Sequence, residues 1–180
     1  DNNKQEKYWL RDVAVIETLF ATGARVSEVS NIRVDSVNLN TGLIRIMGKG
    51  GKERYIQIAS ADILDVLKRY YNQNASAIKK SGFFFVNSRG CRYTEQSIRL
   101  MLKKYTKLAG IDRNITPHMF RHSFATYLIE EGVDISCVQQ ILGHSSIKTT
   151  QIYIHVAAQI QAEILREMHP RNRMNILMVA

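Results

Sequence analysis

The sequence is poor in several residue types, and each shortage excludes a class of protein. Its 180 residues include two cysteines, Cys91 and Cys137, which stand alone, so no pair has the spacing of a metal knuckle or a redox site. No apolar run approaches the roughly 18 to 20 residues that a membrane span needs, and no signal peptide opens the chain. With 45% hydrophobic residues, the sequence instead predicts one compact domain over residues 1–180, in the cytoplasm and with no membrane partner.

The charge of the chain is positive and concentrated in one region. The 25 basic side chains exceed the 16 acidic ones by nine. Residues 42–115 hold 15 basic and five acidic side chains, whereas residues 1–41 and 116–180 are nearly neutral. A regional excess is typical of a surface that faces phosphates and predicts a polyanionic partner, although a solvated basic face without a partner is the alternative.

Apolar residues recur at helical spacing over most of the chain. Capping residues and glycines set the expected ends. The expected helices are residues 8–22, about 25–32, 61–78, one begun by Thr94 and ended by Gly110, one from Thr116-Pro117 to Gly132, one from Asp134 to Gly143, a short one begun by Ser146, and a last one over about 157–168.

Two segments have the alternation of strands instead. Residues 43–47 and 55–58 predict a hairpin whose tip is the glycine-rich segment 48–52, and residues 83–86 are a candidate third strand. The expected class is α+β, mostly α-helical, with a small three-stranded antiparallel sheet at one edge.

Four short stretches hold polar residues that a purely structural element would not need. In the first, Arg25 stands at a helix start, where backbone N–H groups favour an anion, and Glu28 lies one turn further on, placed to hold the guanidinium. An ordinary surface pair explains these two residues equally well.

The second stretch is the hairpin tip, Gly48-Lys49-Gly50-Gly51-Lys52, where the backbone can approach phosphates and Lys49 extends from a ribbon. It is not a phosphate-binding loop of the GxxxxGK[ST] kind, because the spacing differs and a strand follows it. Taken alone, it is an ordinary basic turn.

The third stretch places His118 and Arg121 on one face of a helix, while Phe120 and Phe124 point toward the core. A titratable imidazole beside a fixed cation suits a phosphate site, and we expect a structural role for His122. The fourth stretch pairs His144, in Leu-Gly-His, with Tyr153 nine residues later.

Taken together, these stretches resemble the catalytic set of the tyrosine recombinases, the phage-integrase family, and are most similar to its Xer-type members. The resemblance extends over nearly the whole chain, through ATGARVSE, GKGGKER, TPHMFRHSFAT and LGHSSIKTTQIYIHV. The catalytic residues that it implies are Arg25, Lys49, His118, Arg121, His144 and the nucleophile Tyr153, with Glu28 orienting Arg25.

The resemblance implies a site-specific recombinase that cleaves and rejoins DNA through a 3′-phosphotyrosyl intermediate. Arg25 and Arg121 would clamp the phosphate oxygens, His118 would act as base, and Lys49 would protonate the departing 5′ oxygen. His144 would donate to a phosphate oxygen. Neither ATP nor a metal is needed, and we expect no cofactor, because the sequence has no carboxylate cluster for Mg²⁺ and no zinc spacing.

The resemblance also implies partners. Family members act on double-stranded DNA with a specific recombination site, as homo- or hetero-tetramers on synapsed DNA, so we expect the protein at the nucleoid. An N-terminal DNA-gripping domain of the family is absent from residues 1–180, which favours a fragment. The apolar tail, residues 170–180, packs either on a neighbouring protomer or back in cis.

Two other functions remain open from the residues. One is a basic DNA-binding module without catalysis, and the other is a strand transferase similar to type IB topoisomerases. Either one would use the basic region, whose expected DNA-contacting residues are Lys52, Arg54, Arg89, Arg92, Arg99, Lys103 and Lys104.

Overall fold

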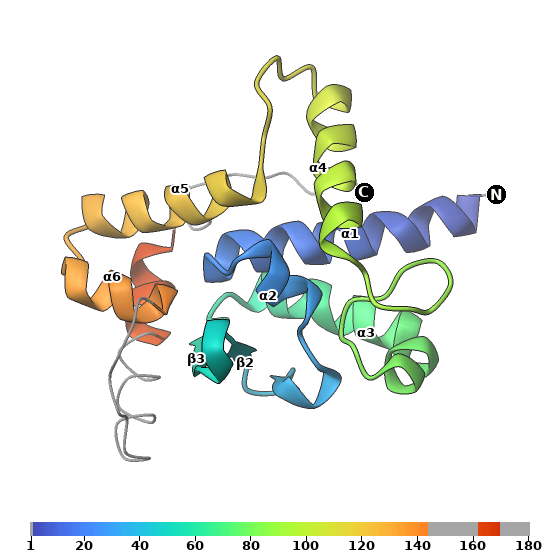
Figure 1. Cartoon of the computed structure of the whole chain (residues 1–180), viewed down its shortest axis with the longest axis horizontal. Helices are drawn as coiled ribbons and strands as arrows, with labels where there is room; N and C mark the ends of the chain where they lie inside the picture. The colour runs from blue at the N-terminus through green and yellow to red at the C-terminus, as the bar shows by residue number, and fades with distance from the viewer. Residues whose placement is uncertain (1, 144–161, 170–180) are drawn as a thin grey trace.

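The computed structural model describes residues 2–143 and 162–169, and it is mostly helical (Figure 1). The helices are α1 (Asn2–Thr22), α2 (Val26–Ser30), α3 (Ala61–Ser81), α4 (Glu95–Leu108), α5 (Pro117–Glu130) and α6 (Ile135–Leu142), with short 3₁₀ turns at Val34–Ser36 and Lys49–Gly51. Residues 162–168 are also helical, which confirms the described end of the last expected helix. The short helix expected at Ser146 lies outside the described residues.

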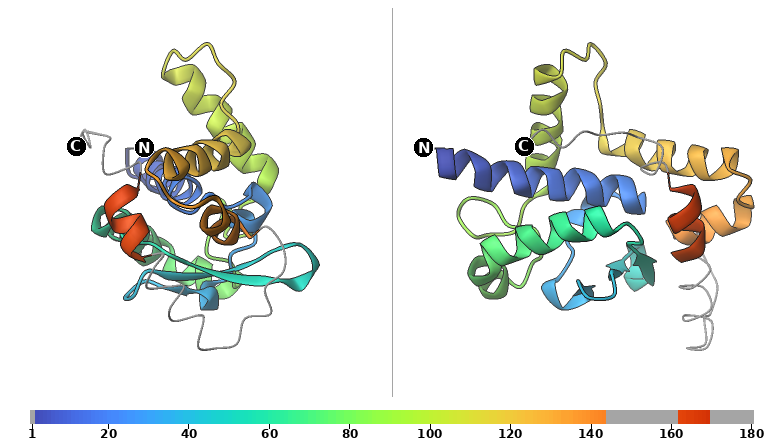
Figure 2. Two further views of the ribbon diagram at one scale, coloured as in Figure 1. Left: turned by 90° about the vertical axis from the view of Figure 1, so that its left-hand side faces the viewer. Right: turned by 180° about the vertical axis from the view of Figure 1, so that it is seen from behind.

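Helix α1 is the central element of the fold. It contacts α3 on one side and α5 on the other, while α4 packs on α2 and projects from the body of the molecule (Figures 1 and 2). No helix in the described part of the chain is both long enough and apolar enough to cross a membrane.

The sheet has three antiparallel strands in the order β1 (Val37–Asn38), β2 (Leu43–Met47) and β3 (Glu53–Gln57). It lies at one edge of the molecule, next to the end of α6 (Figure 1). Ile46 pairs with Arg54 and Ile44 with Ile56, so these four side chains share one face of the hairpin. The predicted fold class and hairpin are confirmed.

The third strand was predicted in the wrong place. Residues 83–86 make only isolated bridges, Phe83 with Arg33 and Val86 with Arg92, and β1 supplies the third strand instead. The aromatic run is apolar because Phe84 and Phe85 are buried against Tyr70, with ring centroids 5.8 and 5.6 Å away. The apolar character of residues 84–86 therefore reflects burial of their side chains in the core and not pairing as a strand.

Among the described residues, two of the predicted capping residues, Thr94 and Asp134, make the expected hydrogen bonds, and Thr116 does not. The Thr94 hydroxyl accepts a hydrogen bond from the Ser97 N–H at 3.2 Å, and the Asp134 carboxylate accepts one from the Ser136 N–H at 2.8 Å. Thr116 makes no such bond, so Pro117, at the first helical position, is the signal that starts α5.

In the described part of the chain, the buried apolar residues form two clusters. The larger joins α1, the sheet, α3 and α4, and the smaller joins α5, α6 and the helical segment 162–168 around Phe124 and Leu128. The link between α1 and α2 meets the smaller cluster at Gly23, whose position beside Phe124 and Leu142 brings this link, α5 and α6 to one place.

Candidate active site

The site begins where α1 ends and α2 starts. The Glu28 carboxylate accepts a hydrogen bond from the Arg25 backbone N–H at 2.7 Å, which satisfies a donor at the start of α2. The same carboxylate accepts one from Arg25 Nη1 at 3.0 Å. The Arg25 side chain stays 44% exposed while that of Glu28 is 4% exposed, so a buried carboxylate holds a guanidinium at the surface.

Arg54 of β3 holds the other side of Glu28. Its Nη1 and Nη2 donate to the two carboxylate oxygens at 2.9 and 2.8 Å, a bidentate geometry. Its Nε donates to the Ile141 carbonyl oxygen of α6 at 3.1 Å, and the side chain is 12% exposed. Arg54 therefore connects the hairpin, α2 and the end of α6.

Arg121 makes a second connection from α5. Its Nη1 donates to the Gly23 carbonyl at 2.8 Å and its Nη2 to the Leu142 carbonyl at 2.9 Å. The residue is 7% exposed. Two guanidinium groups, Arg54 and Arg121, thus bind the last two carbonyls of α6, where the helix end is negative and its carbonyls have no partner within the helix.

Burial and the neighbouring charges shift the pKa values of two groups in this cluster. Burial lowers the pKa of Arg121 to about 10, with a further contribution from the charge of Arg25, so the guanidinium is still protonated at neutral pH. Burial by itself would raise the pKa of Glu28. The hydrogen bonds and charge of Arg54, together with the hydrogen bonds from Arg25, outweigh it and lower the pKa below its ordinary value. The site is therefore a cationic cluster with an ionised carboxylate at its centre.

Two glycines allow this close packing. Gly23 has φ +56°, and a Cβ there would lie 2.7 Å from Phe124 Cδ1 and 2.8 Å from Leu142 Cδ2. Gly143 has φ +73°, and a Cβ there would lie 3.0 Å from Arg54 Cδ. Both glycines adopt the left-handed conformation that side chains disfavour, and at Gly23 the space is filled as well.

Of the other four catalytic candidates, the structure describes His118 and the backbone of Lys49. His118 lies in the first turn of α5, exposed and three residues before Arg121. The backbone of Lys49 is at the hairpin tip between β2 and β3. His144 and Tyr153 lie outside the described residues, although His144 directly follows Gly143 in the chain.

Three other tyrosines, which are alternative candidates for the nucleophile, have phenol groups whose pKa values are raised by burial. The Tyr70 hydroxyl accepts a hydrogen bond from the Val86 N–H at 2.9 Å, and burial raises its pKa to about 12. The Tyr105 hydroxyl donates to Asp12 at 3.1 Å, and burial, with the charge of Asp12, raises its pKa to about 12. Burial raises the pKa of Tyr93 as well. These phenols are harder to deprotonate than a free tyrosine, which suits the core and not nucleophilic attack.

Comparison with known proteins identifies the family. The model of the phage integrase family matches residues 1–159. The chain belongs to the phage integrase family. A tyrosine recombinase of Agathobacter rectalis is 49% identical over 169 residues, which are 94% of this chain and 55% of that protein.

Solved structures of Xer-type members of the phage integrase family share the fold. The crystal structure of XerA recombinase has a TM-score of 0.70 and 34% identity and covers 92% of this chain and 59% of that chain. The XerH site-specific recombinase bound to its palindromic difH substrate, a post-cleavage complex, has a TM-score of 0.68 and 30% identity and covers 87% of this chain and 45% of that one. The chain thus spans about half the length of the curated relatives that it matches. For the Agathobacter rectalis recombinase the share is 55%.

In this phage integrase family member, the predicted DNA-contacting residues divide into two groups. Arg54 is turned inward, as described above. The other six are exposed: Lys52, Arg89, Arg92, Arg99, Lys103 and Lys104. His122, for which a structural role was expected, is also exposed and does not fill the core.

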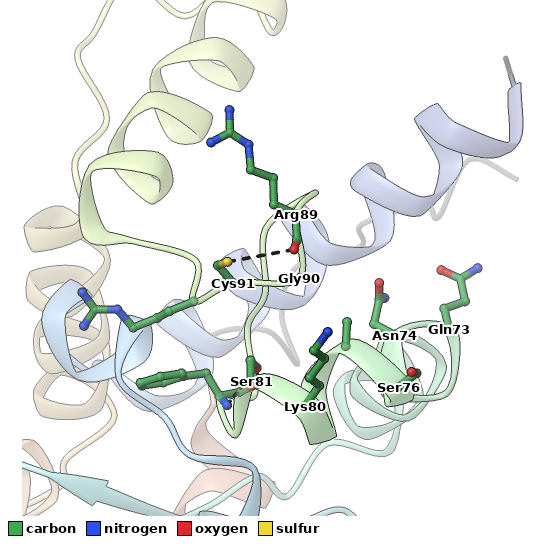
Figure 3. Close-up of a pocket in the computed structure, with 11 residues that line it drawn as sticks. Gln73, Asn74, Ser76, Lys80, Ser81, Arg89, Gly90 and Cys91 are labelled. Atoms are coloured by element: carbon green, nitrogen blue, oxygen red, sulfur yellow. Dashed lines mark hydrogen bonds between the residues drawn. The ribbon is translucent and has the colours of Figure 1, made fainter.

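Two of the exposed arginines border a separate depression between the second half of α3 and the loop of residues 87–92 (Figure 3). It has a volume of about 770 Å³ and is lined by Lys80, Arg89 and Arg92 among others, and none of the described residues in its wall is a catalytic candidate. Lys80 points from α3 toward the loop, and Arg89 points away from α3 (Figure 3). Arg92 donates to the Asn31 side chain and so is partly held within the protein.

The sequence contained a signal for the inward position of Arg54. Arg54, Ile56 and Ile58 alternate, so they share one face of a strand, and the two isoleucines predict that this face is buried. A cation on a buried face needs a partner in the protein. Among the described residues, no group of three or more His, Cys, Asp or Glu side chains could hold a metal ion.

Proposed function

We propose that this chain is the catalytic part of a site-specific DNA recombinase that cuts and rejoins DNA strands through a 3′-phosphotyrosyl intermediate at Tyr153. The observation that carries the proposal is the arrangement of Arg25 and Arg121. One guanidinium is held at the surface by a buried carboxylate, and the other is tied to both neighbouring segments by backbone carbonyls. A basic binding module would not need arginines fixed in this way.

The proposed chemistry follows from these positions. The Tyr153 oxygen attacks the phosphorus, the bond from phosphorus to the 5′ oxygen breaks, and a free 5′-hydroxyl strand leaves. Negative charge that develops on the non-bridging oxygens would be met by Arg25, Arg121 and His144. Guanidinium groups suit this role because they stay charged and bind oxygens in a fixed fork.

Two proton transfers complete the step. His118 would take the proton of the Tyr153 hydroxyl, and its exposed place in the first turn of α5 leaves it accessible to a substrate. Lys49 would give a proton to the leaving 5′ oxygen from the hairpin tip. Rejoining is the reverse reaction, in which a 5′ hydroxyl attacks the phosphotyrosine, so the bond energy is kept and no ATP or metal enters the proposal.

The proposed substrate is double-stranded DNA with a specific site, held in the cytoplasm at the nucleoid. The XerH relative is described bound to its difH substrate. In this chain the exposed cations Lys52, Arg99, Lys103 and Lys104 would bind phosphates, as would Arg89 and Arg92. We also propose that synapsis of two sites assembles a tetramer, to which the tail residues 170–180 would contribute.

The test uses a pool of nicked duplexes with a randomised centre, labelled at the 5′ end of the nicked strand. The nick lets the short 5′-hydroxyl product diffuse away, so a covalent adduct accumulates and resists SDS. We expect a 5′-labelled adduct with the wild-type chain and none with Tyr153→Phe. Equal amounts from the two proteins, or none from either, would overturn the proposal. Relaxation of a supercoiled plasmid without site preference would favour the topoisomerase-like alternative.

A further inference from the structure

Arg54 occupies a position that neither a DNA contact nor an ordinary surface ion pair explains. Its guanidinium donates from all three of its nitrogens to groups of the protein, the two oxygens of Glu28 and the carbonyl of Ile141. Only 12% of the side chain is exposed. By contrast, the Arg69–Asp65 pair on α3 is separated by 4.0 Å with both side chains more than half exposed.

The contacts of Arg54 join the start of α2 to the end of α6. Through Glu28 it touches the carboxylate that orients Arg25, with each oxygen accepting one bond from Arg25 and one from Arg54. Through Ile141 it binds the carbonyl next to the one that Arg121 binds on Leu142. It stands on β3, the strand that leads away from the hairpin tip.

The glycines around Arg54 show that this place is tightly defined. A Cβ at Gly143 would lie 3.0 to 3.3 Å from three atoms of the Arg54 side chain, and one at Gly48 would lie 3.9 Å from its Nη1. Gly48 and Gly143, the glycines that precede Lys49 and His144 in the chain, therefore lie beside the Arg54 side chain. A bidentate fork with a third donor can set the spacing of three segments in a way that a single ammonium cannot.

We propose that Arg54 is a positioning residue of this site, which fixes Glu28, and through it Arg25, against the end of α6 and does not itself bind DNA. This role, which rests on the proposed recombinase function, makes the geometry of the phosphate clamp depend on a side chain that the substrate never touches. The loss of Arg54 then slows cleavage because Arg25 is misplaced.

The role has a signature that a merely structural residue would not produce. The charged groups of the described residues that face Glu28 are Arg25 from the α1–α2 link, Arg54 from β3 and Arg121 from α5. Without Arg54, the hydrogen bonds and charge that oppose the effect of burial on Glu28 are reduced to those of Arg25 and the more distant Arg121, so the pKa of Glu28 rises. Glu28 then takes up a proton as the pH falls through the acidic range, and a neutral Glu28 holds Arg25 less firmly.

The first measurement needs no DNA. In the 180-residue protein with ¹³C-labelled glutamate, the Glu28 side-chain carbon is assigned by its loss in Glu28→Gln and titrated from pH 7 downward. We expect Glu28 to titrate below the ordinary glutamate range in the wild type and at a higher pH in Arg54→Met. Arg69→Met is the matched control at an exposed arginine and should leave Glu28 unchanged. An unchanged Glu28 in Arg54→Met would overturn the role.

The second measurement follows cleavage of the duplex most often recovered from the randomised pool. We expect Arg54→Met to slow adduct formation about 100-fold, as small displacements of a catalytic group do. Its rate should decline further toward acidic pH, and this additional decline should vanish in Glu28→Gln/Arg54→Met. Arg54→Lys keeps the charge, so its rate of adduct formation should lie between those of the wild type and Arg54→Met. This variant serves as the test if Arg54→Met does not fold. DNA affinity should match that of Arg69→Met.

The outcomes separate the two proposals. If the wild type forms no adduct, the proposed function fails while the titration of Glu28 still tests the contacts of Arg54. If the wild type forms the adduct and Arg54→Met loses DNA affinity in proportion to cleavage, Arg54 binds DNA and the positioning role is wrong. The positioning role would also be contradicted if Arg54→Met cleaves more slowly but its rate depends on pH in the same way as that of the wild type.

Discussion

Replacement of Arg121 by lysine tests whether the buried guanidinium both supports the fold and binds phosphate. The wild-type side chain donates through two nitrogens to carbonyls on two segments, Gly23 at 2.8 Å and Leu142 at 2.9 Å. Lysine offers one nitrogen on a different stem, so we expect one of the two carbonyls to lose its donor. Gly23 and Leu142 are both buried, so a carbonyl that loses its donor there is shielded from bulk water.

The expected magnitude follows from that lost bond. An unsatisfied buried polar group lowers the free energy of unfolding by about 2 kcal/mol. For a chain of this size each 1 kcal/mol moves Tm by a few degrees, so Arg121→Lys should melt about 4–8 °C lower than the wild type. Loss of one preorganised donor to the transition state should slow cleavage about 10²–10³-fold. Because the positive charge is kept, duplex affinity should change less than about tenfold.

The assay combines thermal unfolding followed by circular dichroism, adduct formation on the nicked duplex and duplex binding by fluorescence anisotropy. Arg69→Lys, an exposed arginine on α3, is the matched control and should behave as wild type in all three. An Arg121→Lys protein with unchanged Tm would show that the two carbonyl contacts carry no stability. Equal losses in binding and cleavage would mean that Arg121 is a binding residue only.

Two further predictions concern the hairpin and the α1–α2 link. Lys49→Ala should slow cleavage of ordinary DNA, and a substrate with a bridging 5′-phosphorothiolate should restore the rate because its leaving group needs no proton; absence of rescue would remove Lys49 from the acid role. Gly23→Ala should lower the free energy of unfolding by about 3 kcal/mol, because a left-handed side chain costs about 1–2 kcal/mol and forcing extra atoms into a filled site costs more. Gly110→Ala is the matched control, since Gly110 also has positive φ (+65°) but no atom within 4 Å of the added Cβ. If urea unfolding gives equal losses for the two variants, the contact of Gly23 with Phe124 does not restrict the site.

Most of the fold could be predicted from the sequence because local signals and burial agree. The hairpin, the helix ended by Gly143 and the helix begun by Pro117 each have a turn or capping residue beside a regular apolar pattern. The strand predicted at residues 83–86 was wrong because a short apolar run is equally compatible with a buried irregular segment. The real third strand, Val37–Asn38, is two residues long and has no pattern to detect.

The sequence suggests the residue types of the candidate site, but most of the contacts between them could not be predicted from it. Arg25 and Glu28 are neighbours in sequence, so their pairing could be expected, and the structure confirms it. The contact from Arg54 to Glu28 spans 26 positions, and that from Arg121 to Gly23 spans 98. Only the packing of the hairpin and α5 on the α1–α2 link creates these contacts. Net charge predicts that residues 42–115 face DNA, and this stays a prediction. Arg54, within that region, is turned inward.

The proposed mechanism predicts which atom joins the protein to DNA, and this atom can be identified directly. The adduct formed on the nicked duplex is digested with nuclease and trypsin, and the modified peptide is sequenced by mass spectrometry. Cleavage after Lys148 and Arg166 gives the peptide of residues 149–166, in which Tyr153 is the single tyrosine. We expect a nucleotide linked through its 3′ phosphate to Tyr153. A linkage to any other residue, or through a 5′ phosphate, would contradict the proposed mechanism.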